Sequence, residues 1–256
     1  MTLRAITLDY WDTIYVGASE PARVERRQEA LRRLLVALGN ELPAEEFLTL
    51  YGASAQEAHR WWHDEHRGYT TGDRIRWLLA QLAIERPEDC ALVAEAAMEV
   101  DASLLDTPPA LLPGAREALE WLSGRFALAV VSDTGFASGR AQDRLLERDG
   151  LRDLFTATVY SMDVGHAKPR PEPFRAALEA LGVAPGEAVH VGDIERTDVA
   201  GALAVGISAI RLDALRDSGP SQAEYVATSL ADLVRYLRQG RLAQASVSDE
   251  RNSDRM

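Results

Sequence analysis

Several side chains that can do chemistry stand directly after short apolar segments. Asp9 follows "ITL", Ser132 ends "ALAVVS", and Asp193 follows "AVHVG". Lys168 comes a few residues after "TATVYS". A carboxylate at the end of a buried strand is costly unless a cation meets it. The alternative for the stretch "DYWDT" is structural, with Asp9 capping a turn and Asp12 starting a helix.

The elements that must position these residues alternate between strand and helix from residue 114 onward. Short apolar segments of strand length are separated by amphipathic segments such as "PEPFRAALEALG". This alternation predicts an α/β fold with a doubly wound, Rossmann-like parallel sheet that includes the first strand. Ligands bind outside the carboxyl ends of strands in such sheets. We therefore expect Asp9, Ser132, Lys168 and Asp193 to converge on one edge and form an active site.

Residues 21–105 have helical periodicity, and no strand pattern interrupts them. The proline-rich link "DTPPALLPG" then marks a boundary. We expect a core domain of residues 1–16 and 106–240, an inserted all-helical cap domain of residues 17–105, and a disordered tail at 241–256.

The composition is that of an ordinary globular protein, with 256 residues and 46% hydrophobic side chains. The net charge of −12 argues against nucleic acid and anionic membranes as partners. The single cysteine, the lack of a long apolar run and the lack of a signal-peptide pattern predict a cytoplasmic protein. Lys168 is the only lysine among many arginines.

The ordered set of motifs resembles the haloacid dehalogenase-like superfamily. The first motif is the strand ending in Asp9 with Thr13 four residues later, and the second is "VVSD" with Ser132. The third is "AKPRPEPF" with Lys168, and the fourth is "GDIERTD". The helical insertion after the first motif is similar to the cap domain of that superfamily.

The resemblance implies a phosphatase that acts on a small phosphorylated metabolite through an aspartyl-phosphate intermediate. Asp9 would attack phosphorus, Ser132 would donate to a phosphate oxygen, and Lys168 would bridge Asp9 and the phosphate. A planar guanidinium would fit that gap poorly, which accounts for a lysine there. Asp133 stands next to Ser132 in the phosphate-binding segment, where it and Thr134 are otherwise loop or capping residues.

The resemblance also implies a Mg²⁺ cofactor. Asp193 and Asp198 offer the hard oxygen ligands that Mg²⁺ prefers, and Asp9 with the main-chain carbonyl of Trp11 would complete the protein's share. Each residue alone has a structural alternative. Ser132 or Asp193 can cap a helix, and Lys168 or Asp198 can be a solvated surface residue.

The sequence departs from the superfamily pattern at Trp11. Phosphatases of this superfamily have a second aspartate there, which acts as general acid and base, and such a group contributes ~10²- to 10⁴-fold. Asp12 stands where a glycine is usual. One interpretation is a phosphatase for substrates with good leaving groups. The others are a 2-haloacid dehalogenase-like hydrolase, in which this position is also aromatic, and an impaired member that binds a phosphorylated ligand or a protein.

The cap is expected to choose the substrate. The stretch "HRWWHDEH" places His59, His63 and His66 on one helix face, and a histidine there is a candidate for the missing acid. Trp61 and Trp62 are expected in the cap core. For Arg23, Arg26 and Arg27, a charged outer face is the simpler interpretation than contact with the substrate.

Overall fold

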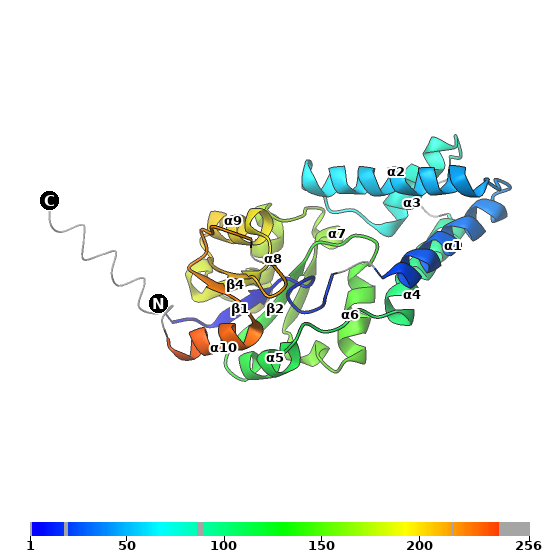
Figure 1. Ribbon diagram of the computed structural model, residues 1–256. Coiled ribbons are helices and arrows are strands. Elements are labelled where there is room, and N and C mark those ends of the chain that lie inside the picture. Colours follow the sequence, from blue (N-terminus) through cyan, green and yellow to red (C-terminus); the bar gives the residue numbers. More distant parts are fainter. Residues whose placement is uncertain (1, 18–19, 86–89, 217, 241–256) are drawn as a thin grey trace.

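The sheet of the protein has six parallel strands in the order β3-β2-β1-β4-β5-β6, as seen in a computed structural model (Figure 1). The structure describes residues 2–17, 20–85, 90–216 and 218–240. The strands are β1 (Ala5–Leu8), β2 (Ala127–Ser132), β3 (Ala157–Tyr160), β4 (Ala188–Gly192), β5 (Ser208–Leu212) and β6 (Tyr225–Ala227). The predicted α/β class with a doubly wound parallel sheet is confirmed.

Alternation along the strands decides which helices cover each face. In β1, Ile6 and Leu8 pack into the large core that includes side chains of helices α5, α6 and α10. Ala5 points to the opposite face, where Phe174 and Leu178 of α8 and the short helix α9 pack. These helices are α5 (Ala115–Ser123), α6 (Gly139–Arg148), α8 (Pro171–Leu181), α9 (Ala200–Ala204) and α10 (Leu230–Arg238). Both faces of the sheet are therefore buried, as parallel strands require.

Among the described residues, the first four helices after β1 form a separate layer beside the sheet, called the helical module below (Figure 1). They are α1 (Pro21–Ala37), α2 (Ala44–His63), α3 (Thr71–Gln81) and α4 (Ala91–Asp106). The module has an apolar core of its own, in which Phe47, Leu78 and Val100 are almost fully buried. None of the helices in the described ranges is long and apolar enough to cross a membrane.

The chain enters and leaves the helical module through two segments that lie side by side. Val16 N donates to Ala110 O over 2.9 Å, and Leu112 N donates to Ile14 O over 2.8 Å. This pair of linkers fixes one end of the module relative to the carboxyl end of β1.

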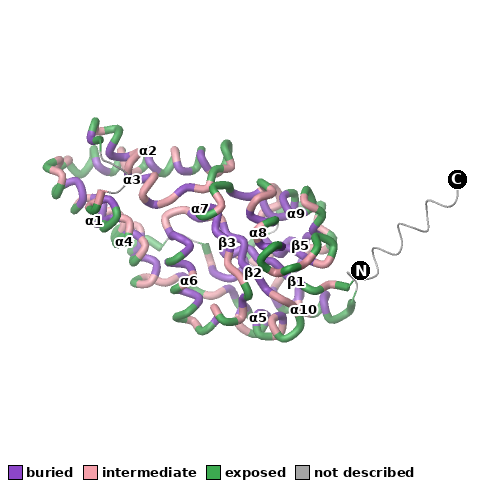
Figure 2. The backbone as a smooth tube through the Cα atoms, turned by 180° about the vertical axis from the view of Figure 1, so that it is seen from behind, coloured by how far each residue is buried: buried purple, intermediate pink, exposed green. Residues whose placement is uncertain are grey.

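A second connection between module and sheet domain lies just before Lys168. Gly68 N donates to Gly165 O over 3.0 Å, and Ala167 N donates to His66 O over 2.8 Å. The central strands are mostly buried, as Figure 2 shows, whereas in this contact Ala167 is buried, His66 and Gly68 are half-buried and Gly165 is exposed. The loop that carries the lysine is thus hydrogen-bonded to the helical module.

The chain departs from the sequence-based expectation after β3 and β4. A short helix, α7 (Ser161–Val164), follows β3, and a π-helical turn, η3 (Glu195–Val199), precedes α9 where one continuous helix was expected. Two 3₁₀ turns, η1 (Arg152–Leu154) and η2 (Pro185–Glu187), complete the described elements. The tail at 241–256 lies outside the described residues.

Candidate active site

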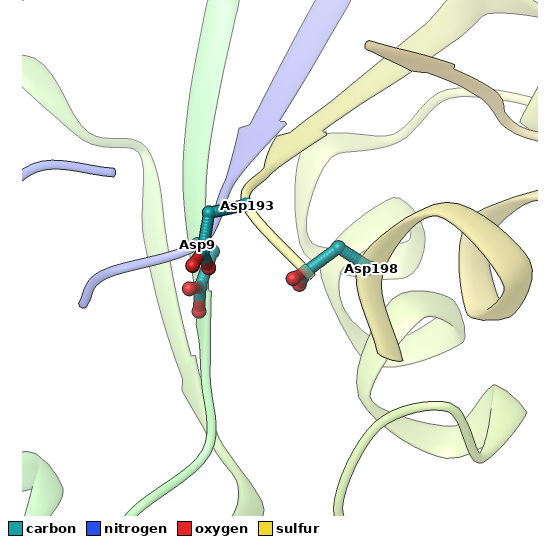
Figure 3. Close-up of side chains that lie close together, drawn as sticks. All are labelled: Asp9, Asp193 and Asp198. Atoms are coloured by element: carbon teal, nitrogen blue, oxygen red, sulfur yellow. The ribbon is translucent and has the colours of Figure 1, made fainter. Parts of the chain in front are cut away.

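Three buried aspartates meet where β1 and β4 run side by side. Asp9 follows β1, Asp193 follows β4, and Asp198 reaches back from the π-helical turn η3 (Figure 3). One carboxylate oxygen from each lies within 4.8 Å of the others. This is the point of the sheet where the strand order reverses, and ligands bind at such points.

The close packing of this cluster requires glycine at the end of β4. A Cβ atom added at Gly192 would lie 2.3 Å from Cγ of Asp198. Only glycine therefore lets Asp198 lie against the end of the strand. Ile194 N also donates to Asp198 Oδ2 over 3.0 Å, which fixes the orientation of the carboxylate.

Lys168 lies between two of the aspartates. Its Nζ donates to Asp9 Oδ1 over 2.5 Å and to Asp198 Oδ1 over 2.6 Å, and its side chain is 2% exposed. Burial lowers the pKa of Lys168, but the carboxylates of Asp198 and Asp9 raise it more, so the group is an ammonium at neutral pH. A compact donor with three N–H groups fits between the two acids.

The three acids have different proton affinities. Burial raises the pKa of Asp9 well above its usual value despite Lys168, and burial with the Asp198 charge raises the pKa of Asp193 to about 7. Burial also opposes ionisation of Asp198, but Lys168 and His190 hold the pKa of that carboxyl well below its usual value. Three carboxyl groups with these different pKa values thus meet the single ammonium of Lys168.

The residues fit a magnesium ion. Asp9, Asp193 and Asp198 each offer a hard carboxylate oxygen, and these oxygens lie within 4.8 Å of one another. Among the described residues, no cysteine or histidine belongs to this group. On the outer side, Arg216 pairs with Asp193 Oδ2 over 2.5 Å from an exposed position. The exposed arginine can leave Asp193 free for a metal at little cost.

A buried histidine supports the cluster from below and was missed in the sequence. His190 in β4 has its Nε2 3.2 Å from Asp198 Oδ1 and its Nδ1 2.9 Å from Thr7 Oγ1. Burial lowers the pKa of His190. The signal was present in the sequence, because a polar residue in the middle of an apolar strand needs a partner.

A cavity of about 360 Å³ opens over the cluster between the sheet domain and the helical module. Its wall on the sheet side includes Trp11 and Asp12 as well as the three aspartates and Lys168. Asp12 has a left-handed backbone with φ of 54°, and its Oδ1 accepts a hydrogen bond from Gly17 N over 2.7 Å. This conformation favours glycine and tolerates aspartate, so Asp12 shapes the loop.

Ser132, in the second predicted motif, does not face the cavity as expected. The Ser132 hydroxyl donates to Gln142 Oε1 over 2.8 Å and is not part of the cavity wall. Ser138, not Ser132, caps the next helix by accepting from Ala141 N. Asp133 does line the cavity, and its Oδ1 accepts from the main-chain N of Lys168 over 2.9 Å.

The helical module contributes His59, Trp62, Tyr69 and Arg74 to the cavity wall, together with two alanines. Trp62 was expected in the module core, but it is half-buried at the cavity and its Nε1 donates to Asp133 Oδ2 over 2.9 Å. Arg74 was not singled out in the sequence, where it is one of many arginines on amphipathic helices.

The expected placement of the three histidines was wrong in one respect. His66 is not on the helix with His59 and His63, because α2 ends at His63. Its backbone is left-handed, with φ of 50°, in the loop that pairs with residue 167.

Of Arg23, Arg26 and Arg27 in α1, only Arg26 is exposed, so the expected charged outer face holds for that residue alone. Arg23 is buried, and its Nε donates to Thr107 O over 3.0 Å. Arg27 Nε donates to Ser103 Oγ of α4 over 3.1 Å, and Arg26 pairs with Asp106. All three hold α1 against the end of the module and its exit linker.

Comparisons with known proteins agree with this architecture. A family model described as haloacid dehalogenase-like hydrolase matches residues 3–206. Ribulose-1,5-bisphosphate 5-phosphatase of Halopiger xanaduensis is 28% identical over 229 residues, which cover 85% of this chain and 88% of that protein. Pyrimidine 5'-nucleotidase YjjG of Escherichia coli is 29% identical over 206 residues, covering 80% and 87%.

A solved structure shows the same arrangement over nearly the whole chain. The 2-haloacid dehalogenase of Pseudomonas syringae superposes with a TM-score of 0.67 at 25% identity, covering 93% of this chain and 99% of that one. The family match spans all four motifs, from the strand before Asp9 to the turn that carries Asp198. The chain belongs to the haloacid dehalogenase-like hydrolase family.

Proposed function

We propose that the protein is a Mg²⁺-dependent phosphatase that hydrolyses a small phosphorylated metabolite through an aspartyl-phosphate on Asp9. The observation that carries the proposal is the position of Lys168, held between Asp9 and Asp198 at the bottom of the cavity. The names of the two relatives above, both phosphatases of phosphorylated sugars or nucleotides, support this reaction class.

The residues of the chain take the following roles. A carboxylate oxygen of Asp9 attacks phosphorus, the bond to the leaving oxygen breaks, and water later releases phosphate and restores the carboxylate. The Lys168 ammonium stabilises the charge on the transferred group. The Ser132 hydroxyl can donate to a phosphate oxygen only after it leaves Gln142, and the half-buried Asp133 keeps the Lys168 backbone in place.

The metal would be held by Asp9, Asp193, Asp198 and the main-chain carbonyl of Trp11. Bound Mg²⁺ neutralises the negative charge that three carboxylates and a phosphate bring together. Burial and the neighbouring carboxylates raise the pKa values of Asp9 and Asp193, and a bound cation would favour the ionised forms of both.

Trp11 determines which substrates suit the site. Its indole has no proton to give to a leaving oxygen at neutral pH, so an alkoxide would leave slowly. Acyl and enol phosphates have leaving groups that need little protonation. We therefore expect these phosphates to react faster than simple phosphate esters, unless a residue of the helical module supplies the proton.

A 2-haloacid dehalogenase activity is the second candidate. The aromatic residue at position 11 favours it, because a halide leaves without a proton, and the Pseudomonas syringae structure has that name. The cluster of Asp9, Asp193 and Asp198 favours the phosphatase, because displacement of halide by a carboxylate has no need for a metal site.

The deciding experiment is hydrolysis of acetyl phosphate and p-nitrophenyl phosphate with Mg²⁺ and with EDTA. We expect turnover that requires Mg²⁺, favours acetyl phosphate and disappears in Asp9→Asn. Release of chloride from 2-chloropropionate in EDTA, with no release of phosphate from either substrate, would replace the phosphatase by the dehalogenase.

A further inference from the structure

The cavity contains a buried cation that the phosphatase reaction does not use. Arg74 on α3 lines the same cavity as Asp9 and Lys168, and the residue is 6% exposed. Its Nε and Nη2 donate to Ser54 Oγ, both over 3.2 Å. Among the described residues, its Nη1 has no hydrogen-bond partner and no carboxylate forms an ion pair with it.

A buried arginine of the sheet domain is balanced by two carboxylates. Arg211, which is fully buried, pairs with Glu195 over 2.9 Å and with Asp213 over 2.8 Å. Arg74 instead lies 3.3 Å from the centroid of the Phe136 ring. A ring face and a hydroxyl compensate only part of the cost of burying a charge.

The guanidinium nevertheless keeps its charge at neutral pH. Burial lowers the pKa of Arg74 to about 10, and the nearby groups that oppose this are the phenols of Tyr51 and Tyr69. Tyr69 itself lines the cavity. The helical module therefore holds a fixed positive charge, without a counter-charge from the described residues, across the cavity from the aspartates and Lys168.

We propose that Arg74 binds a second anionic group of the substrate, a phosphate or a carboxylate, while the first phosphate reacts at Asp9. This inference rests on the proposed phosphatase function and defines its substrate class as small metabolites with two anionic groups. The cavity volume of about 360 Å³ is at the lower end of ligand sites, which suits a compact metabolite. A planar guanidinium with a free Nη1 suits either a phosphate or a carboxylate.

We expect a large preference for substrates with a second anionic group, because only an anion can compensate the buried charge of Arg74. A hydrogen bond to a charged group contributes enough for a ~10- to 100-fold preference. The preference should appear as a lower KM for the doubly charged substrate, since Arg74 touches the group that does not react.

The test compares three matched substrates. Propane-1,3-diol bisphosphate and 3-phosphonooxypropanoate carry a second phosphate and a carboxylate, and propane-1,3-diol monophosphate carries a hydroxyl instead. We expect kcat/KM to be ~10- to 100-fold higher for one or both of the first two. In Arg74→Met this ratio should fall close to one. The substrate that shows the preference identifies whether Arg74 binds a phosphate or a carboxylate.

Arg27→Met is the matched control. Arg27 also lies over the Phe136 ring, at 5.2 Å, and burial lowers its pKa to about 10 as well, but it does not line the cavity. Its substitution should leave the substrate ratio unchanged. Arg74→Lys keeps a positive charge and should keep part of the preference, which separates loss of charge from damage to the helical module.

Binding separates failure of this inference from failure of the proposed function. Calorimetry with propane-1,3-bisphosphonate and with propylphosphonate, both in Mg²⁺, requires no turnover. If the bisphosphonate binds more tightly only when Arg74 is present, the anion site stands even when no phosphate ester is hydrolysed. If the protein hydrolyses phosphates but Arg74→Met has the same substrate and ligand ratios as wild type, the inference is wrong and the phosphatase remains.

Discussion

The indole Nε1 of Trp62 donates to Asp133 Oδ2 over 2.9 Å and thereby joins the helical module to the loop after β2. The other oxygen of the same carboxylate accepts from the main-chain N of Lys168 over 2.9 Å. One aspartate thus connects the position of the module to the position of the lysine. The guanidinium of Arg196, from the turn η3, lies 5.0 Å from the Trp62 ring on the sheet side.

Trp62→Phe should weaken closure of the module over the cavity. It leaves one oxygen of a carboxylate without its donor, which costs ~1–3 kcal/mol when the group is buried. Because Asp133 is half-buried, we expect the lower part of this range and a KM increased ~5- to 10-fold. Steady-state kinetics with acetyl phosphate measure it. Trp77→Phe, which removes a half-buried indole that packs against the core of the module, is the control. An equal effect of both changes would contradict a specific role of Trp62.

Lys168→Arg should abolish most of the activity although the charge is kept. The Lys168 side chain is 2% exposed, and its ammonium pairs with Asp9 on one side and Asp198 on the other. The larger planar guanidinium of arginine must therefore displace one of these two carboxylates. Loss of one well-placed donor costs ~10²- to 10³-fold in turnover. Arg170→Lys, on the exposed residue two positions later, should behave as wild type. A Lys168→Arg variant with more than a third of the wild-type turnover would remove the lysine from the mechanism.

Trp11→Asp should restore proton donation to the leaving group. Trp11 lines the cavity, so a carboxyl at this position faces the substrate. We expect the turnover of an alkyl phosphate to rise ~10-fold or more relative to that of acetyl phosphate, as for an added general acid. Trp11→Asn introduces a side chain with the shape of aspartate but no titratable proton, and it should not raise this ratio. If both variants raise it equally, added space rather than acid catalysis is the cause.

His59→Gln tests the histidine as the substitute acid. Of the three histidines in "HRWWHDEH", only His59 lines the cavity, and its ring stacks on that of His63 at 5.1 Å. If His59 donates the proton, the substitution should slow alkyl phosphate hydrolysis ~10²-fold and leave acetyl phosphate unaffected. His63 is held by Asp64, with 2.8 Å between Nδ1 and Oδ1, so His63→Gln should have no effect. If the rates are unchanged in His59→Gln, neither His59 nor His63 donates the proton to the leaving group.

The sequence alone determined the fold class and the sheet side of the site. Strand periodicity and chain order are local properties, and parallel strands always bring their carboxyl ends to one edge. Asp9, Ser132, Lys168 and Asp193 were therefore expected together from the strand ends, and all but Ser132 line the cavity. Asp198 was added only by the resemblance to the family. The wrong helix assignment for His66 was also local, because a helical spacing does not show where a helix ends without a strong stop signal.

Only the tertiary structure decided what faces these residues across the cavity. Trp62 and Arg74 lie on helices whose apolar and polar spacing fits several orientations, and the packing of the module against the loops after β2 and β3 selects one of them. The bond from Ser132 to Gln142 likewise depends on how α6 packs on the sheet. Contacts between distant segments depend on the sum of many weak packing terms, and no single residue pattern specifies that sum.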